Sequence, residues 1–334
     1  MKIKKILVTG GDGFIGSHLV EKLLNEGHEV TALAQYNSFG SFGWLDHSPS
    51  SSAKNLKLVL GDIRDENFTR VITKQMDAVF HLAALIGIPY SYIAPKSYVE
   101  TNISGTLNIL QAALDNGCRQ VICTSTSEVY GTAQTVPINE KHPLVGQSPY
   151  SATKIAADQL AISFNKSFGL PVSIIRPFNT YGPRQSERAV IPTIIRQIMS
   201  GKSHLDLGVL QTTRDFNYVS DTVAGFLAAL DNELPGGEVI NICSNFEVSI
   251  EQTARMIAAI MGSNIEFNLD TKRIRPEASE VCRLFGDNAL AKKVLGWQPN
   301  YSNLNGFEKG LEKTVDWFRR NEGLYANKNL EHKI

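Results

Sequence analysis

Residues 9–16 read TGGDGFIG and follow an apolar run at the start of the chain. Gly10, Gly13 and Gly16 have G-x-x-G-x-x-G spacing, and Gly11, Gly13 and Gly16 also satisfy G-x-G-x-x-G. Glycines at these positions permit a tight turn and let backbone N–H groups approach a pyrophosphate at a helix N-terminus. Because the motif follows a predicted strand and opens a predicted helix, it indicates a dinucleotide-binding site rather than an ordinary glycine-rich turn.

Short β-branched runs alternate with longer amphipathic segments through the first half of the chain. The predicted strands are 3–9, 29–34, 57–60, 78–82, 120–124 and 172–176. The predicted helices between them include 15–25, 97–116 and 150–168. This order predicts an α/β fold, a Rossmann-type doubly wound parallel sheet with helices on both faces. The strands are apolar throughout, as expected when both faces of a sheet are covered.

The pattern loosens after Pro177, where we expect a smaller C-terminal substrate-binding lobe. Further predicted elements are the helices 222–230, 250–261 and about 304–320 and the strands 239–243 and 265–268. Strand 239–243 is expected to rejoin the sheet. The predicted division is a Rossmann domain at 1–176 plus about 213–243, the lobe at about 177–212 and 244–321, and a disordered tail at 327–334.

The charge balance excludes some classes of protein. The 334 residues include 33 Lys and Arg and 33 Asp and Glu, so the formal net charge is zero. A nucleic-acid binder or a polybasic membrane-surface protein usually carries a basic excess. No apolar stretch reaches the ~18 residues that a membrane span needs. Four scattered cysteines, without CxxC spacing, favour a reducing cytoplasm and no metal site.

The end of the second predicted strand bears on the choice of cofactor. A carboxylate there usually grips the ribose 2′-OH of NAD, but this sequence has Ala34, Gln35 and Tyr36. No Lys or Arg lies between residues 31 and 53 to neutralise the extra phosphate of NADP. Gln35 could hold a neutral hydroxyl, so the sequence favours NAD, with NADP not excluded. The long loop at 37–53 is either a flexible surface connection or a cover over the adenosine half of the cofactor.

Two further segments carry groups suited to proton transfer. Tyr150 and Lys154 form Y-x-x-x-K at the start of a predicted helix, and this spacing puts both side chains on one face. A lysine ammonium near the phenol would lower the tyrosine pKa and make it a base. Thr126, Ser127 and Glu128 follow a central strand, at the edge where open α/β sheets bind ligands.

Together these motifs resemble the nucleotide-sugar branch of the extended short-chain dehydrogenase/reductase superfamily. Beyond TGGDGFIG, the matching segments are HLAA at 81–84, RPFNTYGPR at 176–184, TRDFNYVSD at 213–221 and LGWQP at 295–299. The Thr–Ser–Glu triplet is similar to that of 4,6-dehydratases and uronate decarboxylases, whereas epimerases typically have no Glu there. The segments YNSFGSFGWLD, HLAALIGIPYSYIAP, TSTSEVYGTAQTVPI, GQSPYSATKIAAD and RPEASEV more closely resemble 4,6-dehydratases of legionaminic acid biosynthesis.

The resemblance implies an internal redox reaction on a UDP- or GDP-linked N-acetylglucosamine. Tyr150, aided by Lys154, would act at the sugar C4 hydroxyl, which Thr126 would hold, and Glu128 would remove the C5 proton. Many 4,6-dehydratases carry Asp at the position of Ser127, and a serine hydroxyl is a poor general acid. Uronate decarboxylation and 4-epimerisation remain alternative reactions, and a non-catalytic dinucleotide sensor or scaffold remains an alternative outside enzymes.

The resemblance also implies binding residues and an assembly. The predicted cofactor contacts are Gly10, Gly13, Phe14, Ile15, Gly16, Gln35, Asp62, Ile63, Leu82, Ala83, Ala84, Tyr150 and Lys154. Asp62 could accept from the adenine amino group or belong to a helix N-cap. Asn179, Arg184, Arg214 and Arg275 are the predicted contacts to the substrate diphosphate. Segments 97–116 and 150–168 commonly form a four-helix homodimer interface in this superfamily.

Overall fold

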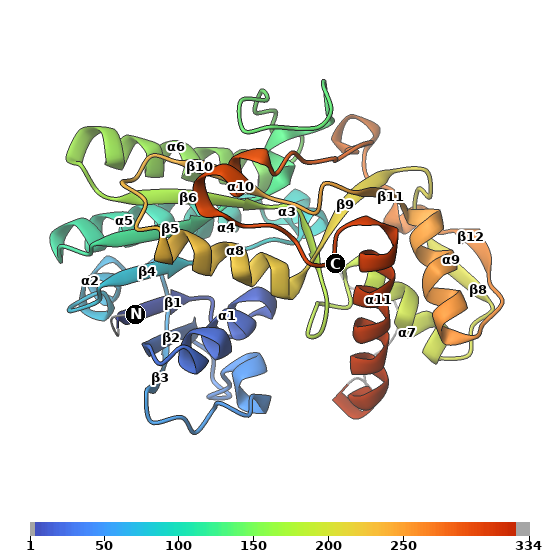
Figure 1. Ribbon diagram of the computed structural model, residues 1–334, viewed down its shortest axis with the longest axis horizontal. Helices are drawn as coiled ribbons and strands as arrows, with labels where there is room; N and C mark the ends of the chain where they lie inside the picture. Colours follow the sequence, from blue (N-terminus) through green and yellow to red (C-terminus); the bar gives the residue numbers. More distant parts are fainter. Residues whose placement is uncertain (1–3, 325–334) are drawn as a thin grey trace.

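The computed structural model describes residues 4–324 and is built around a seven-stranded sheet (Figure 1). The strand order is β10-β6-β5-β4-β1-β2-β3, and every neighbouring pair is parallel. The strands are β1 (Lys5–Thr9), β2 (Glu29–Gln35), β3 (Leu56–Gly61), β4 (Ala78–His81), β5 (Gln120–Thr124), β6 (Val172–Pro177) and β10 (Val239–Ile242). The predicted doubly wound parallel sheet is confirmed, and strand 239–243 joins its edge beside β6.

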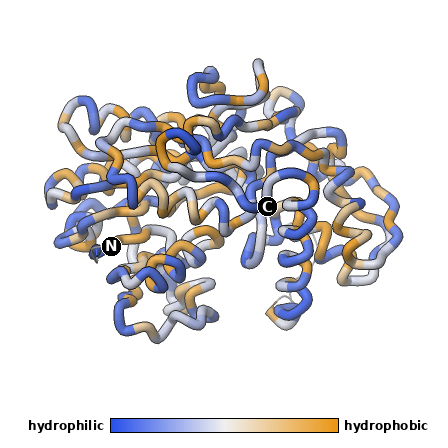
Figure 2. Tube along the Cα trace, in the orientation of Figure 1, coloured by the Kyte–Doolittle hydropathy of each residue, from blue (hydrophilic) through white to orange (hydrophobic). Residues whose placement is uncertain are grey.

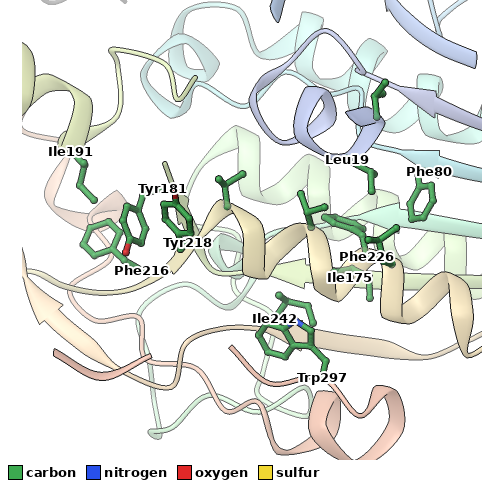
Figure 3. Packing of buried hydrophobic residues seen from close by; sticks show 14 of the residues in the cluster. Leu19, Phe80, Ile175, Tyr181, Ile191, Phe216, Tyr218, Phe226, Ile242 and Trp297 are labelled. Atoms are coloured by element: carbon green, nitrogen blue, oxygen red, sulfur yellow. The ribbon is translucent and has the colours of Figure 1, made fainter. Parts of the chain in front are cut away.

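Helices cover both faces because successive strand residues point to opposite sides. Leu7, Val79 and Val121 pack with residues of α5 (Gly105–Asp115) and α6 (Pro149–Phe168). Phe80 and Ile122 face the other way and pack with residues of α1 (Phe14–Asn25) and α8 (Val219–Asp231). Figure 3 shows Leu19, Phe80 and Phe226 meeting in this second layer. The remaining helix on the first face is α2 (Glu66–Ile72), which contacts α5.

The predicted helix 97–116 is not uniform. It consists of α4 (Pro95–Tyr98), a π-helical turn at Val99–Ser104 and α5. Pro95 opens the segment, preceded by α3 (Ile88–Ile93). Asn102, in the π-helical turn, exchanges hydrogen bonds with the backbone of Leu85 and donates to Thr153 Oγ1 at 3.1 Å. Single π-turns inside α-helices are common at functional sites, and this one links the segment after β4 to α6.

The C-terminal lobe has two small sheets and three amphipathic helices. β7 (Asn179–Tyr181), β9 (Thr213–Tyr218) and β11 (Glu247–Ser249) form one sheet, and β8 (His204–Leu207) pairs with β12 (Glu266–Leu269). The helices are α7 (Val190–Met199), α9 (Ile250–Met261) and α11 (Asn303–Arg320). Figure 2 shows hydrophobic and hydrophilic residues alternating along these helices. Tyr181, Phe216 and Phe307 form an aromatic core that continues the buried cluster of the large domain (Figure 3).

The sequence-based division assigns residues from about 213 to the Rossmann domain, but β9, which begins at Thr213, lies in the small three-stranded sheet of the lobe. β9 pairs with β7 and β11 rather than with any strand of the large sheet, because the chain leaves that sheet after β6 and returns only at β10. The helix α8 that follows β9 does pack on the large sheet. The domain boundaries themselves stay a prediction, and the tail predicted at 327–334 lies outside the described residues. Among residues 4–324, no helix has the length and apolarity of a membrane span.

Candidate active site

The glycine-rich turn between β1 and α1 is shaped for close backbone approach. Gly10 has φ +69°, and a Cβ there would lie 2.8 Å from the Ala83 nitrogen. A Cβ on Gly16 would lie 2.0 Å from the Gly10 oxygen, so neither position accepts a side chain. Gly13 is the exposed N-cap of α1 and has no side chain to occupy the first N–H groups of the helix, which belong to Phe14, Ile15 and Gly16. The turn therefore fits an anion such as a dinucleotide pyrophosphate.

The segment after β4 closes the floor of this turn. Thr9 Oγ1 accepts from the backbone N–H groups of Leu82 and Ala83, each at 3.1 Å. Thr9 Oγ1 also lies 2.8 Å from His81 Nδ1, which fixes the ring beneath the site. Burial, followed by the charge of Lys154, lowers the pKa of His81 to about 3, so the ring is neutral. Leu82, Ala83 and the half-buried Ala84 thus line the turn from the neighbouring strand.

A carboxylate lies beside the C-terminal end of β2 although the strand itself does not end in an acid. The side chain of Asp12, in the glycine-rich turn, hydrogen-bonds the backbone of Gln35, and burial raises its pKa above the ordinary value. Gln35 itself is exposed at the strand end. Sequence reasoning missed Asp12 because it sought an acid within the second strand. The one sequence feature that could have indicated this carboxylate is the presence of Asp12 within the TGGDGFIG motif.

The long loop after β2 is fastened to its surroundings, and we call residues 37–53 the strap. Trp44 donates its backbone N–H to the Asp12 oxygen at 3.1 Å, and its ring lies edge-on to Trp317 of α11 at 5.5 Å. Ser48 Oγ donates to Glu21 Oε1 at 2.6 Å. The strap is therefore attached to the glycine-rich turn, α1 and α11 and is not a free surface connection, while its role as a cover over the adenosine half of the cofactor stays a prediction.

Arg184 lies with this strap and not with the other predicted substrate arginines. Its guanidinium donates to Glu21 Oε1 at 2.7 Å and to Ser17 Oγ at 3.2 Å, so it contacts the same face of α1 as Ser48. Its role at the substrate diphosphate is untested, but its present partners belong to the cofactor side of the molecule.

Asp62 and Ile63 follow β3. Asp62 accepts from Arg64, which lowers the pKa of Asp62, and the N-cap of α2 is Asp65 rather than Asp62. The suggested N-cap role of Asp62 is therefore wrong, since Asp65 accepts the capping hydrogen bond from Phe68. Ile63 is buried and packs where a Cβ on Gly105 of α5 would otherwise lie.

Tyr150 and Lys154 share one face of α6 as predicted. Ser148 and Ser151 form a capping box and Pro149 occupies the first turn, so the helix begins immediately before Tyr150. The Tyr150 ring is buried against Tyr98, whose ring stands edge-on at 6.3 Å, and Ile88. A hydrogen bond with the Thr126 side chain links Tyr150 to the end of β5.

The electrostatic expectation for Tyr150 is not met in this structure. Burial, and then the charge of Glu128, raises the pKa of Tyr150 well above its ordinary value, with the Thr126 hydrogen bond opposing the rise. Lys154 Nζ instead donates to the Thr124 carbonyl at 2.7 Å, and burial lowers the pKa of Lys154. The predicted lowering of the Tyr150 pKa is therefore not seen here, because desolvation of the buried phenol has the largest effect.

Glu128 is surrounded by the arginines predicted to bind substrate. Arg275 Nη1 lies 3.8 Å from Glu128 Oε2, and Arg214 Nη2 lies 3.3 Å from Glu280 Oε1. Burial lowers the pKa of Arg214, while the charge of Glu128 raises it and that of Arg275 lowers it. The structure thus brings Arg214 and Arg275 together at Glu128, next to the buried Ser127.

Among the buried side-chain polar atoms of the described residues that have no hydrogen-bond partner, two lie at the ligand edge of the sheet. Thr124 Oγ1 ends β5, and Asn179 Oδ1 follows β6 in β7. Buried polar atoms are rarely left unpaired, so atoms at this edge point to a bound ligand. No group of three or more His, Cys, Asp or Glu side chains in the described range is placed to hold a metal ion.

Sequence reasoning also missed three buried residues behind the site. Asp158, Tyr130 and Arg176 are linked by hydrogen bonds and lie beneath Glu128 and Lys154. The available signal was an acid four residues after Lys154 on an otherwise apolar face of the predicted helix, because an unpaired buried charge is costly.

The fold and the Thr126, Tyr150 and Lys154 cluster define an extended short-chain dehydrogenase/reductase. The sequence pattern of the family described as GDP-mannose 4,6 dehydratase matches residues 7–314, and the chain belongs to this family. It is similar to a UDP-N-acetyl-alpha-D-glucosaminuronate decarboxylase of Bacillus cytotoxicus, with 36% identity over 96% of this chain and 99% of the relative.

Solved structures give the same class. A DesIV double mutant, a dTDP-glucose 4,6-dehydratase from Streptomyces venezuelae with NAD bound, superposes with a TM-score of 0.86 at 30% identity, over 97% and 98% of the two chains. A UDP-N-acetylglucosamine 4-epimerase from Methanobrevibacter ruminantium superposes with a TM-score of 0.85 at 31% identity, over 96% and 99%. The family therefore comprises nucleotide-sugar dehydratases, decarboxylases and epimerases, and the reaction has to be argued from the site.

Proposed function

We propose that this protein is an NAD-dependent 4,6-dehydratase of a UDP- or GDP-linked N-acetylglucosamine, in a pathway of the legionaminic acid type. The observation that carries the proposal is the convergence of two bases. The Tyr150 phenol hydrogen-bonds Thr126, and the carboxylate of Glu128 is close enough to shift the pKa of Tyr150. A dehydratase needs one base at the C4 hydroxyl and a second at C5–H, whereas a 4-epimerase needs only the first.

The residues perform the following proton transfers in this proposal. The glycine-rich turn with Gly10, Gly13 and Gly16 would hold NAD, which when bound would supply the hydride acceptor and donor of the internal redox reaction and a positive charge that offsets the raised pKa of Tyr150. Tyr150 removes the C4 hydroxyl proton while Thr126 donates a hydrogen bond to the C4 oxygen. The resulting ketone acidifies C5–H, and Glu128 takes that proton. Protonated Glu128 then gives it to the C6 hydroxide, which departs as water, and Tyr150 returns its proton to C5.

Ser127 replaces the Asp that many 4,6-dehydratases carry. A buried serine hydroxyl can donate a hydrogen bond to the leaving oxygen but cannot supply a proton readily. The arrangement therefore assigns both proton transfers at C5 and C6 to Glu128. Arg275, whose Nη1 lies 3.8 Å from Glu128 Oε2, is placed to stabilise negative charge that develops near C6.

NAD rather than NADP is favoured by Asp12. Its carboxylate lies at the Gln35 backbone, where the end of β2 meets the adenosine ribose in this fold. A carboxylate there accepts from a ribose 2′-hydroxyl and repels a 2′-phosphate. Solved relatives with NAD bound support the same choice.

Uronate decarboxylation is the second candidate, and one contact favours it. Arg275 beside Glu128 could also receive a C6 carboxylate, and a decarboxylase of an N-acetylglucosamine-derived uronate shares 36% identity with the chain. Decarboxylation of a 4-keto uronate needs no base at C5, so Glu128 would have a different role in that reaction, and the products have to separate the two candidates.

Mass spectrometry of the products separates these reactions. The purified protein is incubated with UDP- and GDP-N-acetylglucosamine, and separately with the corresponding uronate. Loss of one water from a neutral sugar, with a 4-keto product, supports the proposal. Loss of carbon dioxide from the uronate alone overturns it in favour of decarboxylation, and an isobaric product favours epimerisation.

Homodimer formation and a cytoplasmic location stay predictions. The segments predicted for a four-helix interface, 97–116 and 150–168, pack side by side and leave Val99 of the π-helical turn and Leu107 of α5 exposed. Light scattering of the purified protein would test the dimer.

A further inference from the structure

The three reactive residues Thr126, Ser127 and Glu128 lie on a short turn, and we call residues 125–130 the catalytic turn. It follows β5 and contains the 3₁₀ turn Ser127–Tyr130. Its own stabilising contacts are few: Thr126 Oγ1 accepts from the Glu128 N–H at 3.2 Å, and the Gly131 N–H donates to the Glu128 carbonyl at 3.3 Å. A turn this short does not fix the Glu128 carboxylate by itself, so its two ends decide where that group lies.

The first end is held by Asp158 of α6. Asp158 Oδ2 accepts from Ser125 Oγ at 2.8 Å, and it also accepts from Arg176 Nε and Nη2 at 3.1 and 2.9 Å. Ser125 stands between Thr124, whose carbonyl receives Lys154, and Thr126. Asp158 lies four residues after Lys154 and eight after Tyr150, so one carboxylate joins the helix that carries the catalytic pair to the start of the turn.

The second end is held by Arg176 of β6. Arg176 Nη1 donates to the Tyr130 hydroxyl at 3.0 Å, and its guanidinium lies 5.0 Å from the centre of the Tyr130 ring. The Tyr130 hydroxyl donates in turn to Asn241 Oδ1 of β10 at 2.7 Å. Tyr130 is completely buried and follows Glu128 by two residues. Glu128 is thus connected through Tyr130 to β6 and β10, the two strands at this edge of the large sheet.

The buried ion pair between Asp158 and Arg176 has a desolvation cost that apolar side chains at the same positions would not have. The side chains of Asp158 and Arg176 are each only 3% exposed. A buried ion pair can often be replaced by apolar residues without loss of stability, so stability alone does not account for it. Its hydrogen bonds go to Ser125 and Tyr130, the two residues that bracket the reactive triplet.

We propose that Asp158 and Arg176 are positioning residues that fix the catalytic turn at Ser125 and at Tyr130, and through it place Glu128 against the C5 hydrogen of the sugar. This inference rests on the proposed 4,6-dehydration for the identity of the reacting hydrogen. Neither residue touches the substrate; both act through the turn. A displacement of a reacting group by about 1 Å can cost on the order of 100-fold in rate.

The test uses two mild variants and one matched control. Ser125→Ala and Tyr130→Phe each remove one hydroxyl from the network and leave the ion pair intact. Tyr181→Phe is the control, because Tyr181 is also completely buried and its hydroxyl makes one hydrogen bond, to the Phe307 carbonyl, in the C-terminal lobe. For each protein kcat, KM, Tm and deuterium uptake at C5 in D2O are measured with the sugar nucleotide that the wild type converts.

We expect Tyr130→Phe to lower kcat and C5 exchange about 10- to 100-fold with KM changed less than twofold. Ser125→Ala should lower kcat in the same direction, while Tyr181→Phe should lower Tm comparably and leave kcat within twofold. The proposal is overturned if Tyr130→Phe and Ser125→Ala keep kcat and C5 exchange at the level of Tyr181→Phe. It is equally overturned if all three variants lose activity in proportion to Tm.

A pH profile adds a readout that a structural role would not move. Removing the Asp158 charge by Asp158→Asn lowers the pKa of Lys154, since that carboxylate is the charge that raises it most. The alkaline limb of the kcat profile should therefore move to lower pH in the folded fraction of this variant. An unmoved limb, together with normal kcat in Tyr130→Phe, contradicts the proposal.

Failure of the proposed function would look different. If the wild-type protein releases carbon dioxide or epimerises instead of losing water, the dehydratase assignment fails, whereas the same variants measured on that activity still test the positioning of the turn.

Discussion

Glu128 is the residue to which the proposed dehydration assigns removal of the C5 proton, a step that 4-epimerisation does not include. In Glu128→Gln the side chain keeps its size but cannot accept the C5 proton. We expect kcat for water loss to fall by roughly 10²–10⁴-fold, the usual range for removing a general base, with substrate binding retained. The measurement is water loss followed by mass spectrometry, with C4 oxidation detected by an isotope effect from C4-deuterated substrate. Water loss at the wild-type rate would contradict the role of Glu128.

Asp12 is the residue on which cofactor choice depends in this structure. Asp12→Ser removes the carboxylate beside the Gln35 backbone, so the repulsion of a 2′-phosphate is lost. We expect the ratio of NADP to NAD affinity to rise about tenfold, equivalent to about 1.4 kcal/mol. Titration calorimetry with both cofactors checks this. Asp206→Asn is the charge-matched control, because Asp206 lies in β8 of the C-terminal lobe and is paired with Lys202, and it should leave the ratio unchanged.

At the scale of elements, we expect the strap to retain the adenosine half of the cofactor. Trp44 attaches the strap to the Asp12 carbonyl through its backbone N–H and to the Trp317 ring through its indole. Phe39 lies in the same strap but is 92% exposed. Trp44→Ala should speed NAD dissociation about tenfold, because an aromatic pair contributes roughly 0.5–1.5 kcal/mol and area burial adds to it. Stopped-flow release of bound NAD measures the rate. Phe39→Ala should release NAD at the wild-type rate, and equal rates in the two variants would show that the strap does not retain the cofactor.

Helices and strands with a clear local sequence signal were predictable. Features that depend on contacts between residues far apart in the sequence were not. The strand 29–34 and the helix 15–25 follow from apolar runs and glycines within one window of sequence, and the structure places them within one residue. β9 has the sequence TRDFNY, so no apolar run indicated a strand there, and its partners β7 and β11 are separated from it by long stretches of chain. The π-helical turn at Val99–Ser104 depends on Asn102 reaching Leu85, which no helical periodicity reveals.

The candidate site divides in the same way. The grouping of Thr126, Tyr150 and Lys154 follows from spacing and from the rule that ligands bind at the carboxyl ends of parallel strands. Arg184 contacts Glu21 of α1, and Asp158 supports the catalytic turn through Ser125. Both contacts depend on side chains from separate elements meeting in three dimensions. Motif spacing therefore predicts which groups react, while tertiary contacts decide what holds them.

At the scale of the whole molecule, Asp215 joins the lobe to the large domain. It lies in β9, is completely buried, and accepts hydrogen bonds from Ser244 and Asn245, which follow β10, and from Gly286. Burial raises the pKa of Asp215 from 3.8 to about 6 despite these hydrogen bonds. Because the folded protein binds this proton more tightly than the unfolded chain, the contribution is complete below pH 4 and is lost as pH rises through about 6.

The difference between the two pKa values corresponds to at most about 3 kcal/mol. Other groups also titrate in this range, so the test is a comparison with Asp215→Asn, which cannot titrate. We expect the gap in unfolding free energy between the wild type and this variant to narrow by 1–3 kcal/mol, roughly, between pH 4 and pH 7. Urea unfolding at each pH measures the gap. A gap that stays constant would mean that Asp215 is already ionised in the folded protein at pH 4, and that the hydrogen bonds joining the two halves outweigh its burial.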